Sequence, residues 1–318
     1  MKRPSASYSN ALVSSWATGR GWDHFTGDGQ TPAPADHDIT ALAPERPDRP
    51  PKAAAMTETP LLSARAGGTL TLTFNRPAKL NAFNFEIAEG LIDALRAAEH
   101  DAGVRAIVLR GNGRAFSAGQ DLEVFERLAA SGERIDIADH LRRTYNLVAA
   151  LVRRIEKPVI ASLNGIAAGV GLSVALACDL RVAAEDAELT LGFSKIGLIP
   201  DGGASFMLPL LAGLGRALEL AWTSEKIGAQ EALRIGLVNR VVPAADLEAA
   251  TQTYAAQFAR ISPAAVAVTK RAFNRALLPN FERWLDEEAN LQQAAADGGD
   301  VMEGIRAFVE KRKPAYAQ

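Results

Sequence analysis

Two turns rich in glycine and alanine are the segments of this sequence whose residue types and spacing could do chemistry. One lies in "IVLRGNGRAFSAGQDL" (107–122) and the other in "VIASLNGIAAGVGLSV" (159–174). Each turn follows an apolar strand pattern and precedes a helix pattern, so the first N–H groups of that helix have no partner within it. Small residues let a ligand oxygen approach such amides closely.

If the two strands are neighbours in one sheet, two of these amides can converge on a single oxyanion. Each donor in such an arrangement typically stabilises a transition state by about 3 kcal/mol. Taken alone, either turn is also explained as a tight strand-to-helix connection that binds nothing.

The motifs of other common catalytic devices are missing. No Gly-x-x-x-x-Gly-Lys-Ser/Thr segment occurs, which excludes a P-loop, and no Ser-x-x-Lys or Gly-x-Ser-x-Gly segment occurs. The glycines at 169 and 171 resemble the start of a dinucleotide fingerprint, but its third glycine position holds Val174. His100 and His140 are expected on the surface, without a nucleophile or metal partner. We therefore predict no metal site.

Composition limits the class of protein. The chain has 318 residues, of which 48% are hydrophobic, and a net charge of −2, so one large core is possible and nothing indicates nucleic acid as a partner. The single cysteine, Cys178, excludes an intramolecular disulfide and favours a cytoplasmic location. The uncharged stretch 158–178 approaches bilayer length, but its Pro158 and Asn164 favour a buried strand, turn and helix over a membrane span.

Strand patterns alternate with helix patterns through the middle of the chain, which predicts an α/β fold with mostly parallel pairing. The predicted strands are 69–74, 104–111, 159–165, 180–185, 188–193 and 236–242. The predicted helices are 85–100, a stretch after residue 121, a longer helix from 137 to about 156, and 246–261, 263–278, 281–296 and 300–312.

The first 55 residues differ from the rest, since they hold seven of the sixteen prolines and show no sustained hydrophobic period. We predict a disordered extension over 1–55, a core domain over 56–255 and a helical C-terminal region over 256–318. The extension resembles a transit peptide weakly, and translation starting at Met56 is the preferred alternative.

Five segments, in this order and spacing, together resemble the enoyl-CoA hydratase/isomerase, or crotonase, superfamily. They are "NRPAKLNAF" (75–83), "AFSAGQDL" (115–122), "KPVIASLNGIAAGVGLSVALACDLRVAA" (157–184), "GFSKIGLIPDGG" (192–203) and "EALRIGLVNRVV" (231–242). The resemblance covers about 62–318. It implies a crotonase-like spiral of ββα units whose helical C-terminal region assembles a homotrimer or a dimer of trimers.

The resemblance also implies a coenzyme A thioester substrate, so coenzyme A is part of the substrate and no separate cofactor is expected. In this family two backbone N–H groups hold the thioester oxygen and stabilise the enolate formed on proton loss. Carried over to this chain, these donors are Ala118 and Val170. The implied substrate contacts are Lys79, Asn81, Ala82, Ala118, Gly119, Gln120, Asp121, Leu122, Gly169, Val170 and Phe193.

The departures from the family pattern concern the acid and base. Hydratases of the family use two glutamates, and this chain has Ser173 and Phe193 at those positions. The segment 192–203 is similar to the branch that contains 1,2-epoxyphenylacetyl-CoA isomerase, in which members carry an aspartate where this chain has Leu191. The resemblance therefore favours an isomerase over a hydratase.

The nearest remaining carboxylate on these segments is Asp201. It is either the catalytic base or the N-cap of a helix that begins near Gly202. Asp121 is expected to cap or pair at its turn, and Glu123 and Glu126 to lie in solvent. Two alternatives stay open, namely an enoyl-CoA hydratase with a substitute acid/base group and an acyl-CoA binding protein without catalysis.

Overall fold

The computed structural model describes residues 59–121 and 136–316. The chain divides by its contacts into residues 1–51 and 52–318, and the second unit contains all the described residues. The predictions for the extension 1–55, Leu122, Glu123 and Glu126 therefore lie outside the described residues.

The larger sheet has the strand order β1-β2-β3-β5-β7-β10. Its strands are β1 (Leu61–Ala66), β2 (Thr69–Phe74), β3 (Ala106–Gly111), β5 (Val159–Leu163), β7 (Leu180–Ala184) and β10 (Arg240–Val242). Only the β1–β2 pair is antiparallel, and the four other pairs are parallel. The predicted α/β class with parallel pairing is confirmed, although the sequence interpretation missed β1.

A second, smaller sheet has the order β4-β6-β8-β9. Its strands are β4 (Ala115–Ser117), β6 (Ile166–Ala168), β8 (Glu188–Thr190) and β9 (Ile227–Gly228). Three times, the chain forms one strand of the larger sheet and then one strand of the smaller sheet before the next helix. The consecutive strands are β3 and β4, β5 and β6, and β7 and β8. This repetition is the expected spiral of ββα units. Strands β4, β6 and β9 are too short to produce a recognisable pattern in the sequence.

The helices flank these sheets. They are α1 (Phe85–His100), α3 (Ile137–Arg143), α4 (Tyr145–Arg154), α5 (Gly169–Ala177), α6 (Ala204–Ala212), α7 (Leu214–Thr223), α8 (Ala229–Arg234), α9 (Leu247–Ala259), α10 (Pro263–Leu277), α11 (Phe281–Asp297) and α12 (Asp300–Val309), with short 3₁₀ turns at Pro77–Lys79, Phe193–Ile196 and Ala244–Asp246. The last four α-helices, α9 to α12, confirm the predicted C-terminal helices. The single helix predicted from 137 to 156 is wrong, because the backbone at Thr144, with φ −123° and ψ −91°, separates α3 from α4.

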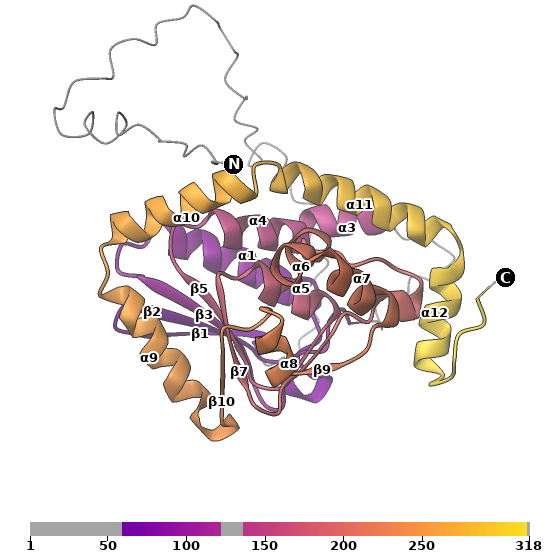
Figure 1. The fold of residues 1–318 in the computed structure, drawn as a ribbon, viewed down its shortest axis with the longest axis horizontal. Helices are drawn as coiled ribbons and strands as arrows, with labels where there is room; N and C mark the ends of the chain where they lie inside the picture. Colours follow the sequence, from indigo (N-terminus) through magenta and orange to yellow (C-terminus); the bar gives the residue numbers. More distant parts are fainter. Residues whose placement is uncertain (1–58, 122–135, 317–318) are drawn as a thin grey trace, which may run out of the picture. The chain divides into compact units, whose positions relative to one another are not determined.

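Helices α10 and α11 run along one side of this unit, next to α4 and α3 (Figure 1). Helix α11 is joined to α3 by the ion pair Arg142–Asp286 at 2.6 Å and by Gln293, whose Oε1 accepts from the Ile137 amide at 2.8 Å. It is joined to α4 through Asn146, whose side chain donates to the Leu285 carbonyl at 2.7 Å. The C-terminal helices are thus tied to the segments that surround α5.

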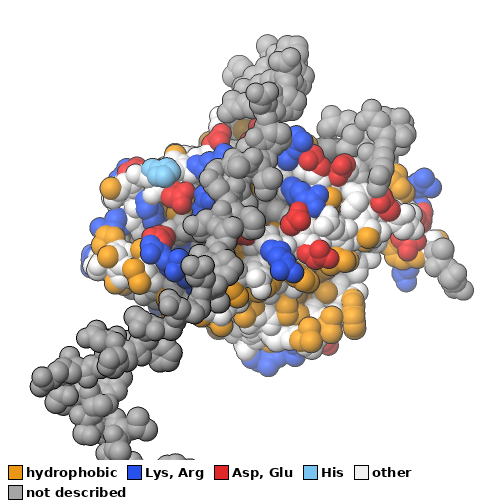
Figure 2. Space-filling model, turned by 90° about the horizontal axis from the view of Figure 1, so that it is seen from above, with side chains coloured by type: hydrophobic (Ala, Val, Ile, Leu, Met, Phe, Trp, Pro, Cys, Tyr) orange, Lys and Arg blue, Asp and Glu red, His pale blue; other side chains and the backbone are white. Residues whose placement is uncertain are grey.

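None of the helices that the structure describes is both long and apolar enough to cross a membrane. The surface in Figure 2 shows Lys and Arg side chains interspersed with Asp and Glu, and hydrophobic side chains gathered toward one edge. This view shows no continuous surface of one charge sign.

Candidate active site

The two glycine-rich turns lie against each other. Strands β4 and β6 pair in parallel, so the turns that follow them emerge side by side. A Cβ atom placed on Gly119 would lie 3.0 Å from the Ala168 carbonyl oxygen and 3.4 Å from the Gly169 Cα. Gly119 also has φ +94°, a conformation that glycine adopts most easily. The condition that the two turns be neighbours is therefore met.

The amide of Ala118 cannot hold a ligand, because it is already used within the protein. It donates to the Leu80 carbonyl at 2.9 Å. The next amide, that of Gly119, donates to the Ser117 hydroxyl at 3.1 Å. The prediction of Ala118 as an oxyanion donor is therefore wrong, and Gly119 does not replace it.

The free donor of the first turn is Gln120. Phe83 donates to the Gly119 carbonyl at 2.7 Å and accepts from the Asp121 amide at 2.8 Å, which forms a parallel bridge opposite Gln120. In such a bridge the N–H of the opposing residue faces away from the partner strand. The Gln120 N–H has no hydrogen-bond partner among the described residues.

Val170 supplies the matching donor of the second turn. It is the second residue of α5, where amides have no partner within the helix, and Ala168 at the N-cap provides no side-chain hydrogen bond. No described residue accepts from the Val170 N–H. Gln120 and Val170 thus have two unused amides on adjoining turns.

Asp201 lies next to the second turn. A Cβ placed on the neighbouring Gly202 would meet Ser173 Cβ at 3.2 Å, Val170 Cγ2 at 3.4 Å and Tyr145 Cβ at 3.5 Å. Asp201 is only 6% exposed, and its Oδ2 accepts from the Gln292 side chain at 2.8 Å. Its Oδ1 is buried without a hydrogen-bond partner in the part of the chain described.

The N-cap interpretation of Asp201 is wrong. Helix α6 begins at Ala204, and its N-cap is Gly203, which receives no side-chain capping bond. Burial raises the pKa of the Asp201 carboxyl to about 8, with a further contribution from the charge of Glu288, while the hydrogen bond from Gln292 opposes the shift. At pH 7 roughly one tenth of such a group is ionised, so both forms are available for proton transfer.

The two positions at which hydratases carry glutamate hold no acid or base. Ser173 is fully buried, and its hydroxyl donates to the Gly169 carbonyl at 3.3 Å. Phe193 is 6% exposed and stands beside the equally buried Leu191. Asp201 is therefore a carboxyl group that the described structure brings close to this end of α5.

Two further polar side chains, those of Tyr145 and His140, contact the side chain of Gln120 in the first turn. The Tyr145 hydroxyl donates to Gln120 Oε1, and His140 Nε2 lies 3.3 Å from the same oxygen. Burial lowers the pKa of His140 to about 4, against the opposing charge of Asp139, so its imidazole is neutral at pH 7. Burial also raises the pKa of Tyr145, with further contributions from Asp201 and Asp121.

The expected surface position of His140 is wrong, because its ring packs edge-on against Phe85 and Tyr145 with centroids 4.9 and 5.2 Å away. His100 is exposed as expected. No local sequence pattern marks Tyr145 as a site residue, since its partners come from other elements.

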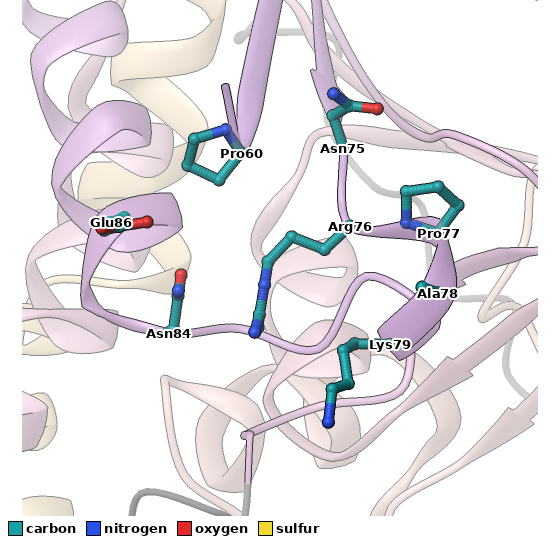
Figure 3. A pocket seen from close by; sticks show the side chains of 8 residues that line it. All are labelled: Pro60, Asn75, Arg76, Pro77, Ala78, Lys79, Asn84 and Glu86. Atoms are coloured by element: carbon teal, nitrogen blue, oxygen red, sulfur yellow. The ribbon is translucent and has the colours of Figure 1, made fainter. Parts of the chain in front are cut away.

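The loop after β2 lines a surface pocket, and hydrogen bonds of Arg76 and Asn81 hold this loop in place. A pocket of about 320 Å³ is lined by Pro60, Asn75, Arg76, Pro77, Ala78, Lys79, Asn84 and Glu86 (Figure 3). The Arg76 side chain extends across it toward Asn84. Arg76 pairs with Asp121 at 2.8 Å, which confirms the expected ion pair at that turn, and also donates to the Ala82 carbonyl at 2.6 Å.

Asn81 supports this loop and is not available to a ligand. Its side chain is fully buried and donates to the carbonyls of Asn112 and Ala115 at 2.9 and 2.7 Å. Its Oδ1 accepts from the Arg76 amide at 2.9 Å. The prediction that Asn81 contacts substrate is therefore wrong, whereas the exposed Lys79 lines the pocket.

A side chain at Gly171 should disturb the first turn. A Cβ there would lie 2.5 Å from Ser117 Cβ, and Ser117 cannot turn away without losing its bonds to the Asn81 carbonyl and the Gly119 amide. We expect Gly171→Ala to lower the free energy of unfolding by about 1–3 kcal/mol in urea denaturation. The control Gly215→Ala meets no atom within 4 Å in α7 and should raise it by about 0.5 kcal/mol. Equal stability of the two variants would contradict this close packing.

Among the described residues, no three His, Cys, Asp or Glu side chains gather as metal ligands would. The spiral of ββα units, with two unused amides on adjoining turns, defines the class of fold. A family model described as enoyl-CoA hydratase/isomerase matches residues 64–318. This chain belongs to that family.

Individual relatives agree with this assignment. The chain is 36% identical to 1,2-epoxyphenylacetyl-CoA isomerase of Escherichia coli (strain K12), over 80% of this chain and 97% of the relative. It is 39% identical to a probable enoyl-CoA hydratase of Rhodobacter capsulatus, over 78% of this chain and 94% of the relative. A crystal structure of an enoyl-CoA hydratase from Mycobacterium avium subsp. paratuberculosis superposes with a TM-score of 0.73 at 34% identity, covering 81% of this chain and 99% of that one.

Proposed function

We propose that this protein is an acyl-CoA isomerase that moves a proton along the acyl chain of a coenzyme A thioester. The observation that carries the proposal is the pair of unused amides at Gln120 and Val170, with the buried carboxyl of Asp201 close by. The relatives named above act, by their names, on acyl-CoA substrates of this kind.

In the proposed reaction the ionised Asp201 takes a proton from an acyl carbon. The C–H bond breaks, an O–H bond forms on the carboxyl, and the electron pair moves to the thioester oxygen as an enolate. The amides of Gln120 and Val170 donate hydrogen bonds to that oxygen and stabilise its charge. The protonated Asp201 then returns the proton to a different carbon, so the double bond shifts and no cofactor is consumed.

Isomerisation is favoured over hydration because it needs one proton-transfer group. Hydration in this family uses two glutamates, and the side chains at those positions are Ser173 and Phe193. An enoyl-CoA hydratase in which Asp201 alone activates water is the second candidate, since Asp201 titrates near neutral pH. A protein that binds acyl-CoA without turnover is the third, motivated by the same two replacements.

One experiment separates these candidates. The wild-type protein is incubated in deuterated water with a trans-3-enoyl-CoA and, separately, with a trans-2-enoyl-CoA, and the products are followed by proton NMR. We expect conversion of the 3-enoyl to the 2-enoyl ester, with deuterium at the γ-carbon that receives the returned proton and, through reversal of the first step, at the α-carbon of the 3-enoyl ester. Addition of water across the 2-enoyl bond would support the hydratase instead. If several acyl-CoA esters bind but show no exchange, the protein binds acyl-CoA without turnover, which is the third candidate.

We further propose a homotrimer or a dimer of trimers, as the family resemblance implies. Large apolar side chains on separate helices support an extended protein contact, because Trp222 on α7, Phe273 on α10 and Phe308 on α12 are 71%, 64% and 60% exposed. A cytoplasmic location is proposed from the lone, buried Cys178, which has no cysteine partner in this chain.

A further inference from the structure

Two buried polar residues of α11 face the segment that contains Asp201. Glu288 and Gln292 are four residues apart, so they lie on the same side of the helix, and both side chains are fully buried. Polar side chains of this kind are rarely buried unless they are fully hydrogen-bonded. Their partners all lie in residues 199–205, which run from the segment after the 3₁₀ turn at Phe193–Ile196 into the first turn of helix α6.

Gln292 fixes the Asp201 carboxyl. Its amide oxygen accepts from the Ile199 N–H at 2.8 Å, and its Nε2 donates to the Ile199 carbonyl at 2.8 Å. The same Nε2 donates to Asp201 Oδ2 at 2.8 Å. One carboxyl oxygen is thus tied to α11, and the other, Oδ1, is buried without a hydrogen-bond partner among the described residues.

Glu288 holds the start of α6, directly after Asp201. Its Oε1 accepts from the Gly203 amide at 2.8 Å, and its Oε2 accepts from the amide of Ser205 at 3.2 Å and from the Ser205 hydroxyl. Trp284 Nε1 donates to that hydroxyl at 2.9 Å. A second carboxyl group is therefore built into the same buried region as Asp201.

We propose that Glu288 and Gln292 are positioning residues that control, in opposite directions, how readily Asp201 releases its proton. This inference rests on the proposed function, in which Asp201 is the proton-transfer group. Burial raises the pKa of Glu288 to about 7, so its carboxyl is mostly ionised near pH 8, where Asp201 titrates. That negative charge disfavours the ionisation of Asp201, whereas the N–H of Gln292 stabilises the ionised carboxyl. Together they keep the proton affinity of the Asp201 carboxyl at a level at which it can both take a proton and return it.

Few other charges act on Asp201. On α4, Tyr145 interacts electrostatically with Asp201, and its hydroxyl remains protonated because burial and the charge of Asp201 raise its pKa. Helices α5 and α6, which pack beside it, contain no ionisable residue. The groups on α11 are therefore the ones that a substitution can change without altering the oxyanion donors.

The test compares Glu288→Gln and Gln292→Met with the wild type by the pH profile of kcat/KM for α-proton exchange. In the wild type the rate should rise with pH through about 8, as Asp201 ionises. Glu288→Gln removes the neighbouring charge and should move this rise to lower pH by about one unit. Gln292→Met removes the donor and should move it to higher pH. The control Glu287→Gln changes an exposed acid on the same helix and should leave the profile unchanged.

Shifts in opposite directions would support the proposal, because a role in folding alone does not predict them. Profiles that coincide with the wild type, or that move in the same direction, would overturn it. If Glu288→Gln does not fold, as judged by circular dichroism, the direction of the Gln292→Met shift decides alone. Failure of the proposed function would look different, since the wild type would not exchange or Asp201→Asn would retain exchange.

Discussion

Val170→Pro lowers kcat for α-proton exchange by about 10²–10³-fold, the typical loss on removing one oxyanion donor. Proline has no N–H, so the substitution deletes one of the two unused amides. Val170 is the second residue of α5, and proline is tolerated in the first turn of a helix because that N–H has no partner there. The measurement is deuterium exchange at the α-carbon, with circular dichroism to establish that the variant folds.

The matched control is Val170→Ala, which shortens the side chain but keeps the amide. We expect its kcat to stay within a few-fold of the wild type, even if loss of buried methyl groups lowers its stability by about 1–2 kcal/mol. If the alanine and proline variants lose activity equally, the side chain of Val170 matters and its N–H does not. That result would also remove the main support for the proposed enolate.

Asp201→Asn lowers the exchange rate by about 10²–10⁴-fold, because an amide can neither take nor return the proton. The same substitution should stabilise the fold at alkaline pH. An ionised carboxyl at this buried position has an oxygen without a described partner, and leaving such a group unsatisfied costs about 1–3 kcal/mol. Loss of activity together with a gain in stability would identify Asp201 as a functional group and not a structural one.

The direction of the pH effect follows from the pKa of Asp201, which burial raises from 3.8 to about 8. The folded state therefore binds more protons than the unfolded state between these values. Its stabilisation is fully present below about pH 4 and is lost as the pH rises through 8. Urea unfolding at pH 6 and pH 9 should show this loss in the wild type and a weaker one in Asp201→Asn. Glu287→Gln, at an exposed position of α11, should behave as the wild type, and full exchange activity of Asp201→Asn would contradict the assignment.

Most of the fold could be predicted from the sequence, because its evidence is local. Apolar runs such as 104–111 and 159–165 predicted the buried strands β3 and β5, and the periodicity of the last third predicted α9 to α12. Strands of two or three residues, such as β4 and β9, could not be predicted, since they exist only through pairing with a distant strand.

The sequence by itself determined the family, the two turns with their small residues, and the replacement of both hydratase glutamates by Ser173 and Phe193. Residue identity is sufficient for these conclusions. The tertiary structure decided which amide of the first turn is free. The Ala118 N–H bonds to the carbonyl of Leu80, so the unused N–H of this turn is that of Gln120.

The tertiary structure also decided the state of Asp201. In the sequence it looked like a helix cap, yet its hydrogen-bond partner is Gln292, 91 residues away on α11, and its charge neighbour is Glu288. The availability of an amide and the proton affinity of a carboxyl both depend on which groups surround them. Those groups come from segments far apart in the chain, and only folding brings them within hydrogen-bond distance.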